Sequence, residues 1–315
     1  EPLLRPDLLS VVARVFRRKQ MGIDYVETNS SWVTNAERVR EVLGLLLENG
    51  VSTLLLSISP FHNEYIPYDK VKMLRRVAGE MGMGIFPWLD GFTTDLEKMD
   101  TSRRHSIDEM EEHFGPGYLS RIPERYWVTL RGRALVTYRS FLREQPVESF
   151  LEGGGPGPCR ELEDTSHFHL DLFGNYLPGL CPGLALPAED IGRPISSDKY
   201  PFLYLLLTQG VAGLYRLAQQ TYGFIPRHAD FQGDDSPDER EYTGYVSKCE
   251  LCQEIRAFLV LDAGVESPDL SPRQFYEQYR DALGKGTAPP WLETETPGTK
   301  TQRAKRLKND GKTLP

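Results

Sequence analysis

The sequence predicts an α/β protein with a parallel sheet or barrel, followed by a smaller α+β region. Helical and strand patterns alternate over roughly the first 95 residues, which is typical of β–α–β units. One strand pattern, Val51–Ser59, is almost entirely apolar, as in strands buried on both faces of a parallel sheet. A Gly- and Pro-rich break at 153–158 then separates two regions with different patterns. We therefore predict domains at 1–150 and 151–286, with a disordered tail at 287–315.

The first region starts with a helix, a strand and a second helix. Asp7–Gln20 has apolar residues at helical spacing and Arg and Lys in its last turn, which indicates a helix. Ile23–Thr28 follows as a strand. Asn35 is a candidate cap for the next helix, Ala36–Glu48, which ends where Asn49-Gly50 interrupts the pattern.

The alternation continues beyond the buried strand. Tyr68–Met81 predicts a third helix and Met83–Leu89 a third strand. The polar stretch Asp95–Arg125 predicts charged helices with an irregular segment, and Arg133–Tyr138 predicts another strand.

Beyond the break the pattern is less regular. His167–Phe173 alternates as a strand does, and Gly174-Asn175 predicts a turn. Tyr200–Tyr222 and Cys249–Leu261 predict two helices.

Composition limits the classes of function. The net charge of -8 argues against nucleic acid or an anionic membrane as the main partner. No apolar run approaches the ~20 residues of a membrane span. Four cysteines in 315 residues are too few for a disulfide scaffold, and the start carries no export signal. We therefore expect a cytoplasmic protein. Because the first residue is not Met and the start resembles the middle of a domain, we also expect a fragment.

All four cysteines follow the Gly-rich break: Cys159, Cys181, Cys249 and Cys252. The last two form a CxxC motif at the start of a predicted helix, where two thiolates can face one metal and the helix N-terminus favours their charge. Cys181 lies in a stretch dense in Gly and Pro, which keeps the backbone tight. Four thiolates form a closed site for zinc or for a 4Fe–4S cluster, and residue type alone does not separate the two.

Other interpretations of the cysteine region compete with a metal site. The cysteines can be unrelated free or buried residues, while a thioredoxin-like redox pair fits poorly because no matching fold pattern surrounds the CxxC. His167 and His169 share one face of a predicted strand, so they are candidates for a role beside the metal ligands. Partly buried structural histidines are the commoner case.

The first residues resemble a motif of radical S-adenosylmethionine (SAM) enzymes. Glu1-Pro2 is similar to the end of the Gly-Gly-Glu-Pro motif, which in that family holds the amino group of the cofactor's methionine. Asn29, Ser57 and Ser59 resemble the polar ends of family strands that contact SAM. The resemblance implies a partial (β/α)6 barrel whose first strands are missing. It also implies that these four residues bind SAM.

The cysteine region resembles the auxiliary-cluster domains called SPASM or twitch. His167–Leu186, with Cys159 before it and the CxxC after it, is similar to their cysteine-bearing hairpin. The resemblance implies one auxiliary 4Fe–4S cluster held by the four cysteines. Full SPASM domains have seven cysteines, so this chain is closer to the twitch type. Such domains are common in peptide-modifying enzymes, which implies a peptide or small-molecule substrate without identifying it.

The CxxxCxxC motif that binds the SAM-cleaving cluster is absent from the chain. The resemblance therefore places that motif before Glu1 and implies that this chain alone does not carry out radical chemistry. In the intact enzyme, an electron from the cluster would cleave SAM, and the 5′-deoxyadenosyl radical would abstract hydrogen from substrate. Two rival hypotheses stay open. One is a zinc-stabilised α/β binding or scaffold protein, and the other is a metal-free barrel enzyme using His62 and Glu64 in acid–base chemistry.

Overall fold

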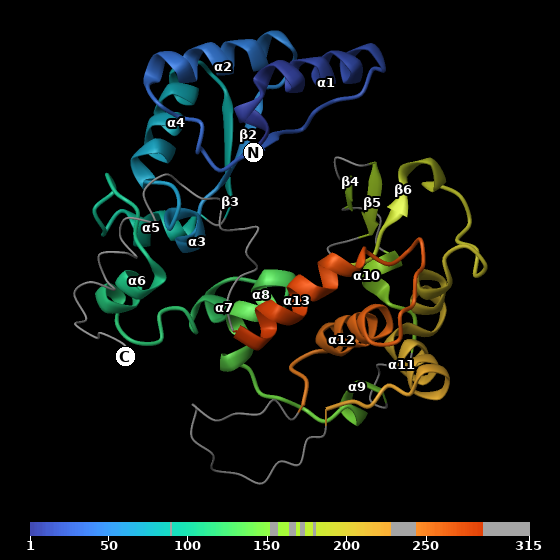
Figure 1. Cartoon of the computed structure of the whole chain (residues 1–315). Coiled ribbons are helices and arrows are strands. Elements are labelled where there is room, and N and C mark those ends of the chain that lie inside the picture. Colours follow the sequence, from blue (N-terminus) through green and yellow to red (C-terminus); the bar gives the residue numbers. More distant parts are fainter. Residues whose placement is uncertain are drawn as a thin grey trace, which may run out of the picture. The chain divides into compact units, whose positions relative to one another are not determined.

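The chain forms two compact units, residues 1–127 and 128–315. The computed structural model describes residues 1–88, 90–151, 157–163, 168–170, 174–178, 181–227 and 244–285 (Figure 1). The predicted tail at 287–315 lies outside the described residues.

A three-stranded parallel sheet organises the first unit, in the order β1-β2-β3. β1 (Val26–Thr28), β2 (Thr53–Ser57) and β3 (Gly84–Trp88) each follow a helix, as the alternating pattern predicted. In register, Thr28 lies opposite Leu56, so the carboxyl ends of β1 and β2 meet at one edge of the sheet. The described strands form an open sheet, and the partial (β/α)6 barrel stays a prediction.

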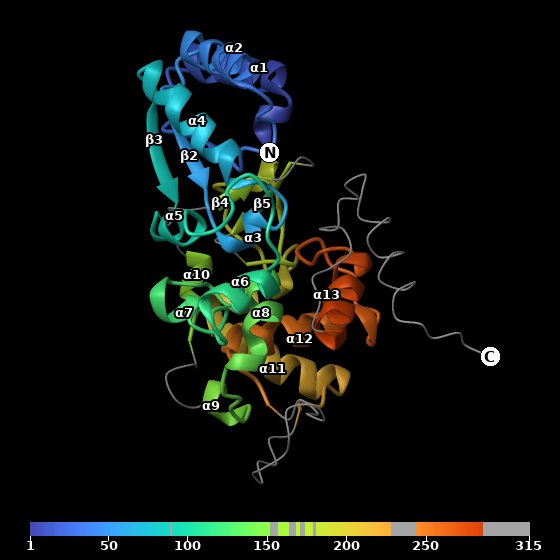
Figure 2. The ribbon, with the colours of Figure 1, turned by 90° about the vertical axis from the view of Figure 1, so that its left-hand side faces the viewer.

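Helices α2 (Ala36–Glu48) and α4 (Tyr68–Glu80) pack against each other beside this sheet (Figures 1 and 2). Asn35 caps α2 as predicted, because its side-chain oxygen accepts a hydrogen bond from the backbone N of Arg38 at 2.9 Å. The core of the unit consists of the leucines and valines that these helices and strands bury. The fully buried members include Val39, Leu43, Leu46, Leu54, Leu56, Leu74 and Val77.

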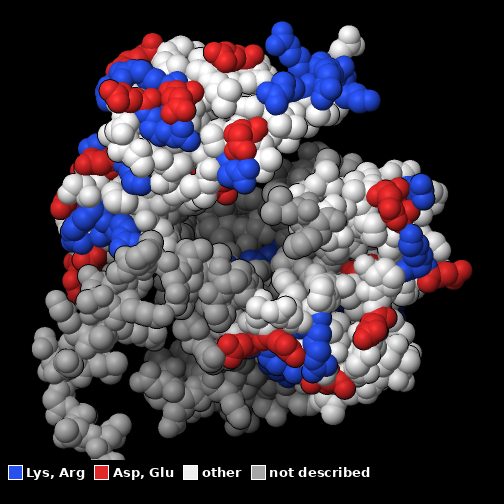
Figure 3. Space-filling model, turned by 45° about the horizontal axis from the view of Figure 1, so that its top comes forward, with Lys and Arg blue, Asp and Glu red and all other residues white. Residues whose placement is uncertain are grey.

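Helix α1 (Pro6–Arg18) is covered on one side only. Ser10 and Ala13 are buried, whereas Leu8, Val11 and Val15 are 40–53% exposed. These three residues share one face, because they follow each other at helical spacing. Lys and Arg side chains gather near the end of the helix (Figure 3). The apolar face of α1 therefore lacks full cover within the described part of the chain.

Short helices complete the first unit, and the charged stretch Asp95–Arg125 contains helices as predicted. Asp95 is buried and accepts hydrogen bonds from the Tyr118 hydroxyl at 2.9 Å and from Arg125 at 2.8 Å, which ties two of these helices together. The short helices are η1 (Pro2–Leu4), α3 (Pro60–Asn63), α5 (Gly91–Leu96), α6 (Ile107–Phe114) and α7 (Ile122–Arg125).

Three helices form the core of the second unit: α11 (Pro201–Tyr222), α12 (Lys248–Leu261) and α13 (Arg273–Lys285). α12 packs against both α11 and α13. The predictions of α11 and α12 are confirmed, whereas α13 was not predicted. None of the described helices is both long and apolar enough to cross a membrane.

A small antiparallel sheet, in the order β4-β5-β6, belongs to the same unit. It consists of β4 (Phe168–Leu170), β5 (Asn175–Pro178) and β6 (Leu186–Pro187). β4 overlaps the strand predicted at His167–Phe173. The ends of that predicted strand, His167 included, lie outside the described residues.

The second unit begins at Val128, before the boundary that we predicted after residue 150. The segment ahead of the Gly-rich break belongs with the later helices, because Val147 is part of their core and Gln145 pairs with Tyr245. The remaining short elements are η2 (Arg139–Phe141), α9 (Glu148–Leu151), α10 (Arg160–Glu163) and η3 (Ala188–Asp190).

The prediction of a strand at Arg133–Tyr138 was wrong, because this segment forms the helix α8 (Gly132–Tyr138). Leu135 and Tyr138 are its buried residues. Their spacing of three residues places both on one helical face, so packing overrides the strand preference of the local sequence.

Helix α11 is interrupted at Gly210, whose backbone (φ 63°, ψ -159°) is almost exclusive to glycine. In an uninterrupted helix the carbonyl of Leu206 would accept from the N–H of residue 210. Here that carbonyl accepts from the backbone N of Cys159 at 2.9 Å. A Cβ on Gly210 would lie 1.9 Å from the carbonyl oxygen of Gly157. The interruption therefore lets the segment that carries Cys159 lie directly on α11.

We predict that Gly210→Ala lowers the free energy of unfolding by about 3 kcal/mol or more, since it adds a steric clash to backbone strain. Gly223→Ala is the matched control, because Gly223 also has a positive φ (76°) but has open space around it. The control should cost only about 1 kcal/mol. Urea unfolding followed by circular dichroism measures both. Equal losses for the two variants would contradict the close contact at Gly210.

Candidate metal centre

The four cysteines line one cavity of about 490 Å³ in the second unit. Cys159 lies just before α10, and Cys181 lies between β5 and β6. Cys249 and Cys252 occupy the first two turns of α12. Three separate segments of the chain thus bring their thiols to the same place, and all four predicted metal ligands are among the lining residues.

One face of α12 forms a wall of this cavity. Cys249, Cys252, Gln253 and Arg256 all line it. Their spacing (i, i+3, i+4, i+7) places them on a single face of the helix. The helix starts in a defined register, because the Ser247 hydroxyl caps it by accepting from the backbone N of Glu250 at 3.1 Å.

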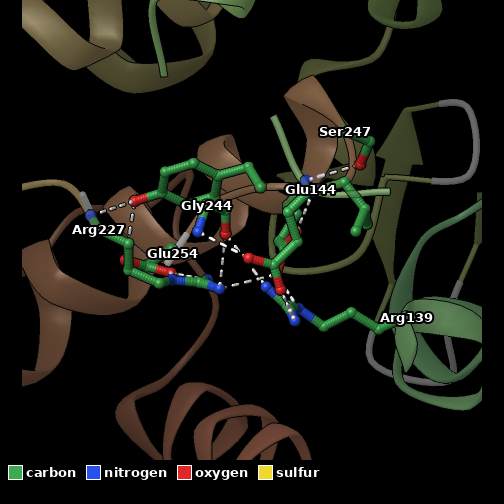
Figure 4. Close-up of polar contacts among 9 residues, drawn as sticks. Arg139, Glu144, Arg227, Gly244, Ser247 and Glu254 are labelled. Atoms are coloured by element: carbon green, nitrogen blue, oxygen red, sulfur yellow. Dashed lines mark hydrogen bonds and ion pairs between the residues drawn. The ribbon is translucent and has the colours of Figure 1, made fainter. Parts of the chain in front are cut away.

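A buried charge network holds the start of α12 in place (Figure 4). Glu250 is fully buried and accepts from Arg139 Nε at 2.6 Å and from Arg227 Nη1 at 3.0 Å. Its other carboxylate oxygen accepts from the backbone N of Val246 at 2.7 Å. The carboxylate thus connects the helix start to two segments that are distant in sequence.

Further contacts of the two arginines extend the network. Arg139 Nη1 donates to Glu144 at 2.7 Å, and Glu144 in turn accepts from the backbone N of Gly244 at 2.8 Å. Arg227 donates to Glu254, one helical turn beyond Glu250 (Figure 4). The side of α12 away from the cysteines is therefore fixed by paired charges.

The loop that carries Cys181 is held by hydrogen bonds from side chains of α12 and α13. Arg256 Nη1 donates to the carbonyl of Pro182 at 2.8 Å, and the Tyr276 hydroxyl donates to the carbonyl of Gly183 at 2.6 Å. A Cβ on Gly183 would lie 2.8 Å from Arg256 Nη1. Glycine is therefore required here so that the guanidinium can approach the backbone.

The cavity wall is positively charged. The described residues that line it include four cations, Arg131, Arg160, Lys248 and Arg256, but a single carboxylate, Glu161. Lys248 Nζ lies 3.0 Å from Glu161, which neutralises one of these charges. The excess of cations makes the cavity a suitable place for an anionic group.

Two of these cations point at the thiols. Burial tends to lower the pKa of Arg131, but a hydrogen bond and charge interaction with Cys249 raise it above its usual value. Burial likewise opposes the charge of Arg256, and the charges of Cys252 and Cys181 outweigh burial and raise its pKa. Both arginines act to lower the pKa of Cys181, and Arg256 also acts to lower that of Cys252, although burial outweighs them.

Burial favours the neutral form of three of the four thiols, Cys159, Cys181 and Cys252. Burial raises the pKa of Cys252 to about 11 and, together with the carboxylate of Glu161, raises the pKa of Cys159 to about 12. Burial also raises the pKa of Cys181. The thiols influence one another, since Cys181 and Cys249 each raise the pKa of Cys252. The helix N-terminus therefore does not suffice to ionise Cys252, and a bound metal would have to displace its proton.

The spacing of the thiols bears on the kind of metal group they fit. Among the described residues, no three His, Cys, Asp or Glu side chains are grouped closely enough to hold a single metal ion. Tetrahedral zinc, with Zn–S bonds of about 2.3 Å, needs its sulfurs roughly 4 Å apart. A 4Fe–4S cluster binds each thiolate on a different iron, so its sulfurs stand further apart. In the described residues the four thiols thus share one cavity without forming a three-ligand group for a single ion.

The predicted SAM-binding residues lie in the first unit. Glu1 and Asn29 are brought together, because the Glu1 carboxylate accepts from the backbone N of Asn29 at 2.8 Å. The same carboxylate accepts from the Thr28 hydroxyl at 3.0 Å and from the backbone N of Leu3 at 2.9 Å. Glu1 is therefore fixed at the carboxyl end of β1.

Ser57 and Ser59 lie at the end of β2, and each has a local partner. The Ser57 hydroxyl donates to Glu27 at 2.7 Å. The Ser59 oxygen accepts from the backbone N of His62 at 3.2 Å, so it caps α3, and it lies 2.6 Å from His62 Nδ1. The cap accounts for Ser59 structurally. Glu64, the other member of the acid–base hypothesis, is the residue that ends α3.

Sequence reasoning missed the cavity residues other than cysteine. Arg256 and Gln253 carry a local signal, because the CxxC continues as Cys-Glu-Leu-Cys-Gln-Glu-Ile-Arg and helical spacing places both on the cysteine face. Arg131 carries none, since only the tertiary fold brings it to Cys249. His169 is exposed on β4 and is not among the residues that line the cavity.

Comparisons with protein-family models, with curated proteins and with solved structures find no match to this chain. The geometry and chemistry of the cavity therefore carry the functional argument.

We predict that Glu250→Gln lowers the free energy of unfolding by about 3–5 kcal/mol, because it leaves the charges of Arg139 and Arg227 without their shared buried partner. The matched control is Glu277→Gln, which breaks an exposed pair with Arg273 and should cost less than about 0.5 kcal/mol. Urea unfolding measures both variants. A loss for Glu250→Gln as small as that of the control would show that the network does not hold α12.

We also predict that Cys252 in the metal-free chain reacts about 100-fold more slowly with iodoacetamide at pH 8 than in the unfolded chain, because only the thiolate reacts. The rate should rise until the pH approaches about 11. Since unfolded thiols ionise first, the folded state should also lose stability as the pH rises from about 8.5 toward that value. Mass spectrometry of the alkylated peptide follows the reaction. Equal rates in the folded and unfolded chains at pH 8 would contradict the raised pKa.

Proposed function

We propose that Cys159, Cys181, Cys249 and Cys252 hold one 4Fe–4S cluster, and that the chain is part of a radical SAM enzyme in which this cluster is auxiliary. The observation that carries the proposal is the cavity itself, which collects all four cysteines of the chain from three separate segments. Unrelated free cysteines would have no reason to share one cavity.

The charge of the cavity supports an iron–sulfur cluster. Four thiolates bring more negative charge than the cluster core cancels, so the whole assembly is anionic. The cations Arg131 and Arg256 lie against the sulfur atoms and provide the compensating charge. Residue type alone also allows zinc, and the resemblance of the cysteine region to auxiliary-cluster domains is what favours the cluster.

The first unit supports the SAM part of the proposal. Glu1, Asn29, Ser57 and Ser59 all lie at the carboxyl ends of parallel strands, where α/β folds place their ligand contacts. In a radical SAM enzyme these residues would bind SAM, and a cluster bound elsewhere in the enzyme would supply the electron for its cleavage. Glu1 would accept a charge-assisted hydrogen bond from the methionine ammonium. Its carboxylate is already oriented by Thr28 and Asn29, which is the preorganisation that such a contact needs.

The partly covered helix α1 supports a larger barrel. Leu8, Val11 and Val15 leave an apolar face exposed, and β1 is an edge strand among the described residues. Further strands beside β1 would cover both features. We place the protein in the cytoplasm, where thiols stay reduced, and propose a peptide or a small molecule as the substrate.

The proposal predicts about four irons and four sulfides per chain after anaerobic reconstitution with iron and sulfide. Cys181→Ser and Cys252→Ser should each lose most of this iron, because each removes one cluster ligand. Chemical analysis of iron, sulfide and zinc measures the loading. Ser197→Ala, an exposed residue of the same unit, is the control and should load fully.

The opposite result has an equally definite meaning. One tightly bound zinc per chain without sulfide would exclude the cluster and would leave a zinc-stabilised binding or scaffold protein as the better account. Full iron loading of both cysteine variants would show that the four cysteines do not act together.

A further inference from the structure

Arg256 is a buried cation with no carboxylate partner among the described residues. Its side chain is 1% exposed. Its hydrogen bonds within the described part of the chain go to the carbonyl oxygens of Pro182 at 2.8 Å and Cys252 at 3.3 Å, and its Nη2 lies 3.9 Å from the sulfur of Cys181. A buried charge costs several kcal/mol unless an opposite charge compensates it. The acidic groups that act on it are Cys252, Cys181 and Tyr276, and the two cysteines line the cavity. A negative group bound in the cavity would therefore compensate its charge.

Gln253 gives a second and independent indication of a bound group. Gln253 is 1% exposed and lines the same cavity, and its Nε2 has no hydrogen-bond partner in the part of the chain that the structure describes. A buried donor without a partner costs about 1–3 kcal/mol. Gln253 follows Cys252 directly on the cavity face of α12, so an acceptor within the cavity would satisfy it.

We infer that Arg256 and Gln253 compensate the charge of the cluster and raise its reduction potential. This inference rests on the proposed cluster. Reduction adds one negative charge to the cluster, and a nearby buried cation stabilises the reduced form more than the oxidised form. Hydrogen bonds to the sulfur atoms act in the same direction. The two side chains therefore favour the reduced form.

Arg256 differs from two other cations of the cavity, Arg160 and Lys248, because it is buried and has no carboxylate partner among the described residues. Arg160 also lines the cavity but is exposed, so solvent screens its charge. Lys248 is paired with Glu161. Arg256 is enclosed and lies beside two of the four cysteines, so its effect on the potential should be the largest of these three.

The test is the midpoint potential of the reconstituted chain, measured by a redox titration followed by electron paramagnetic resonance. Arg256→Met keeps an unbranched chain but removes the charge, so the potential should move to more negative values. Arg256→Lys keeps the charge, so its midpoint potential should lie close to that of the unmodified chain. Arg160→Met is the matched control and should shift the potential much less.

Gln253→Leu provides a variant that does not depend on the folding of the Arg256 variants. It removes a buried donor without a partner, so the thermal midpoint of the cluster-free chain should not fall. With the cluster bound, the potential should still move to more negative values. A purely structural role for Gln253 would not change the potential.

The possible outcomes separate this inference from the proposed function. If the unmodified chain takes up no iron and sulfide, the proposed cluster is wrong and the inference falls with it. If the chain loads a cluster but Arg256→Met and Gln253→Leu both leave the potential unchanged, the inference alone is overturned. If the Arg256→Met chain takes up no cluster, the midpoint potential of the Gln253→Leu chain decides whether the inference holds.

Discussion

A buried positive charge that faces the cysteines is the constraint on which the candidate metal centre depends. Arg256 is enclosed, its guanidinium reaches the loop of Cys181, and no carboxylate is among its hydrogen-bond partners in the described residues. A protein tolerates such a charge when a negative group completes the site. Protonated thiols do not provide it, whereas thiolates bound to a metal cluster do. A metal–thiolate group bound in the cavity would therefore serve both the arginine and the cysteines.

Helix α12 carries both the residues that line the cavity and the ion pairs that hold the helix in the second unit. One face carries Cys249, Cys252 and Arg256 to the cavity, while Glu250 and Glu254 form ion pairs on the other side. The buried charge network fixes the register of the helix start, and so fixes the position of the two thiols. The interruption of α11 at Gly210 has a similar effect, because it lets the segment of Cys159 bond directly to the helix. The cavity is thus held by the charge network behind α12 and by a backbone hydrogen bond within its own wall, from Cys159 to Leu206.

Local signals in the sequence predicted much of the fold. The cap at Asn35, the alternating helices and strands of the first unit, and the helices α11 and α12 all depend on residues that are close together in the chain. The segment of α8 was wrongly predicted as a strand. Packing against distant residues decides which of its side chains are buried, and the local sequence does not show this. The CxxC motif and the family resemblance predicted that the four cysteines act together, and the structure shows that they line one cavity. Arg131 and the kink at Gly210 could not be predicted, because both depend on contacts between distant segments.

The most direct test of the central claim is the Mössbauer spectrum of the chain reconstituted with 57Fe. If all four cysteines ligate one 4Fe–4S cluster, every iron has a cysteine ligand, and the oxidised spectrum should show no distinct ligand-deficient iron site. A spectrum with one distinct iron would show that a cysteine stays outside the cluster. A spectrum of isolated iron ions without sulfide-bridged iron would contradict the account, because it would leave the charge of Arg256 without the anionic cluster that the cavity is proposed to hold.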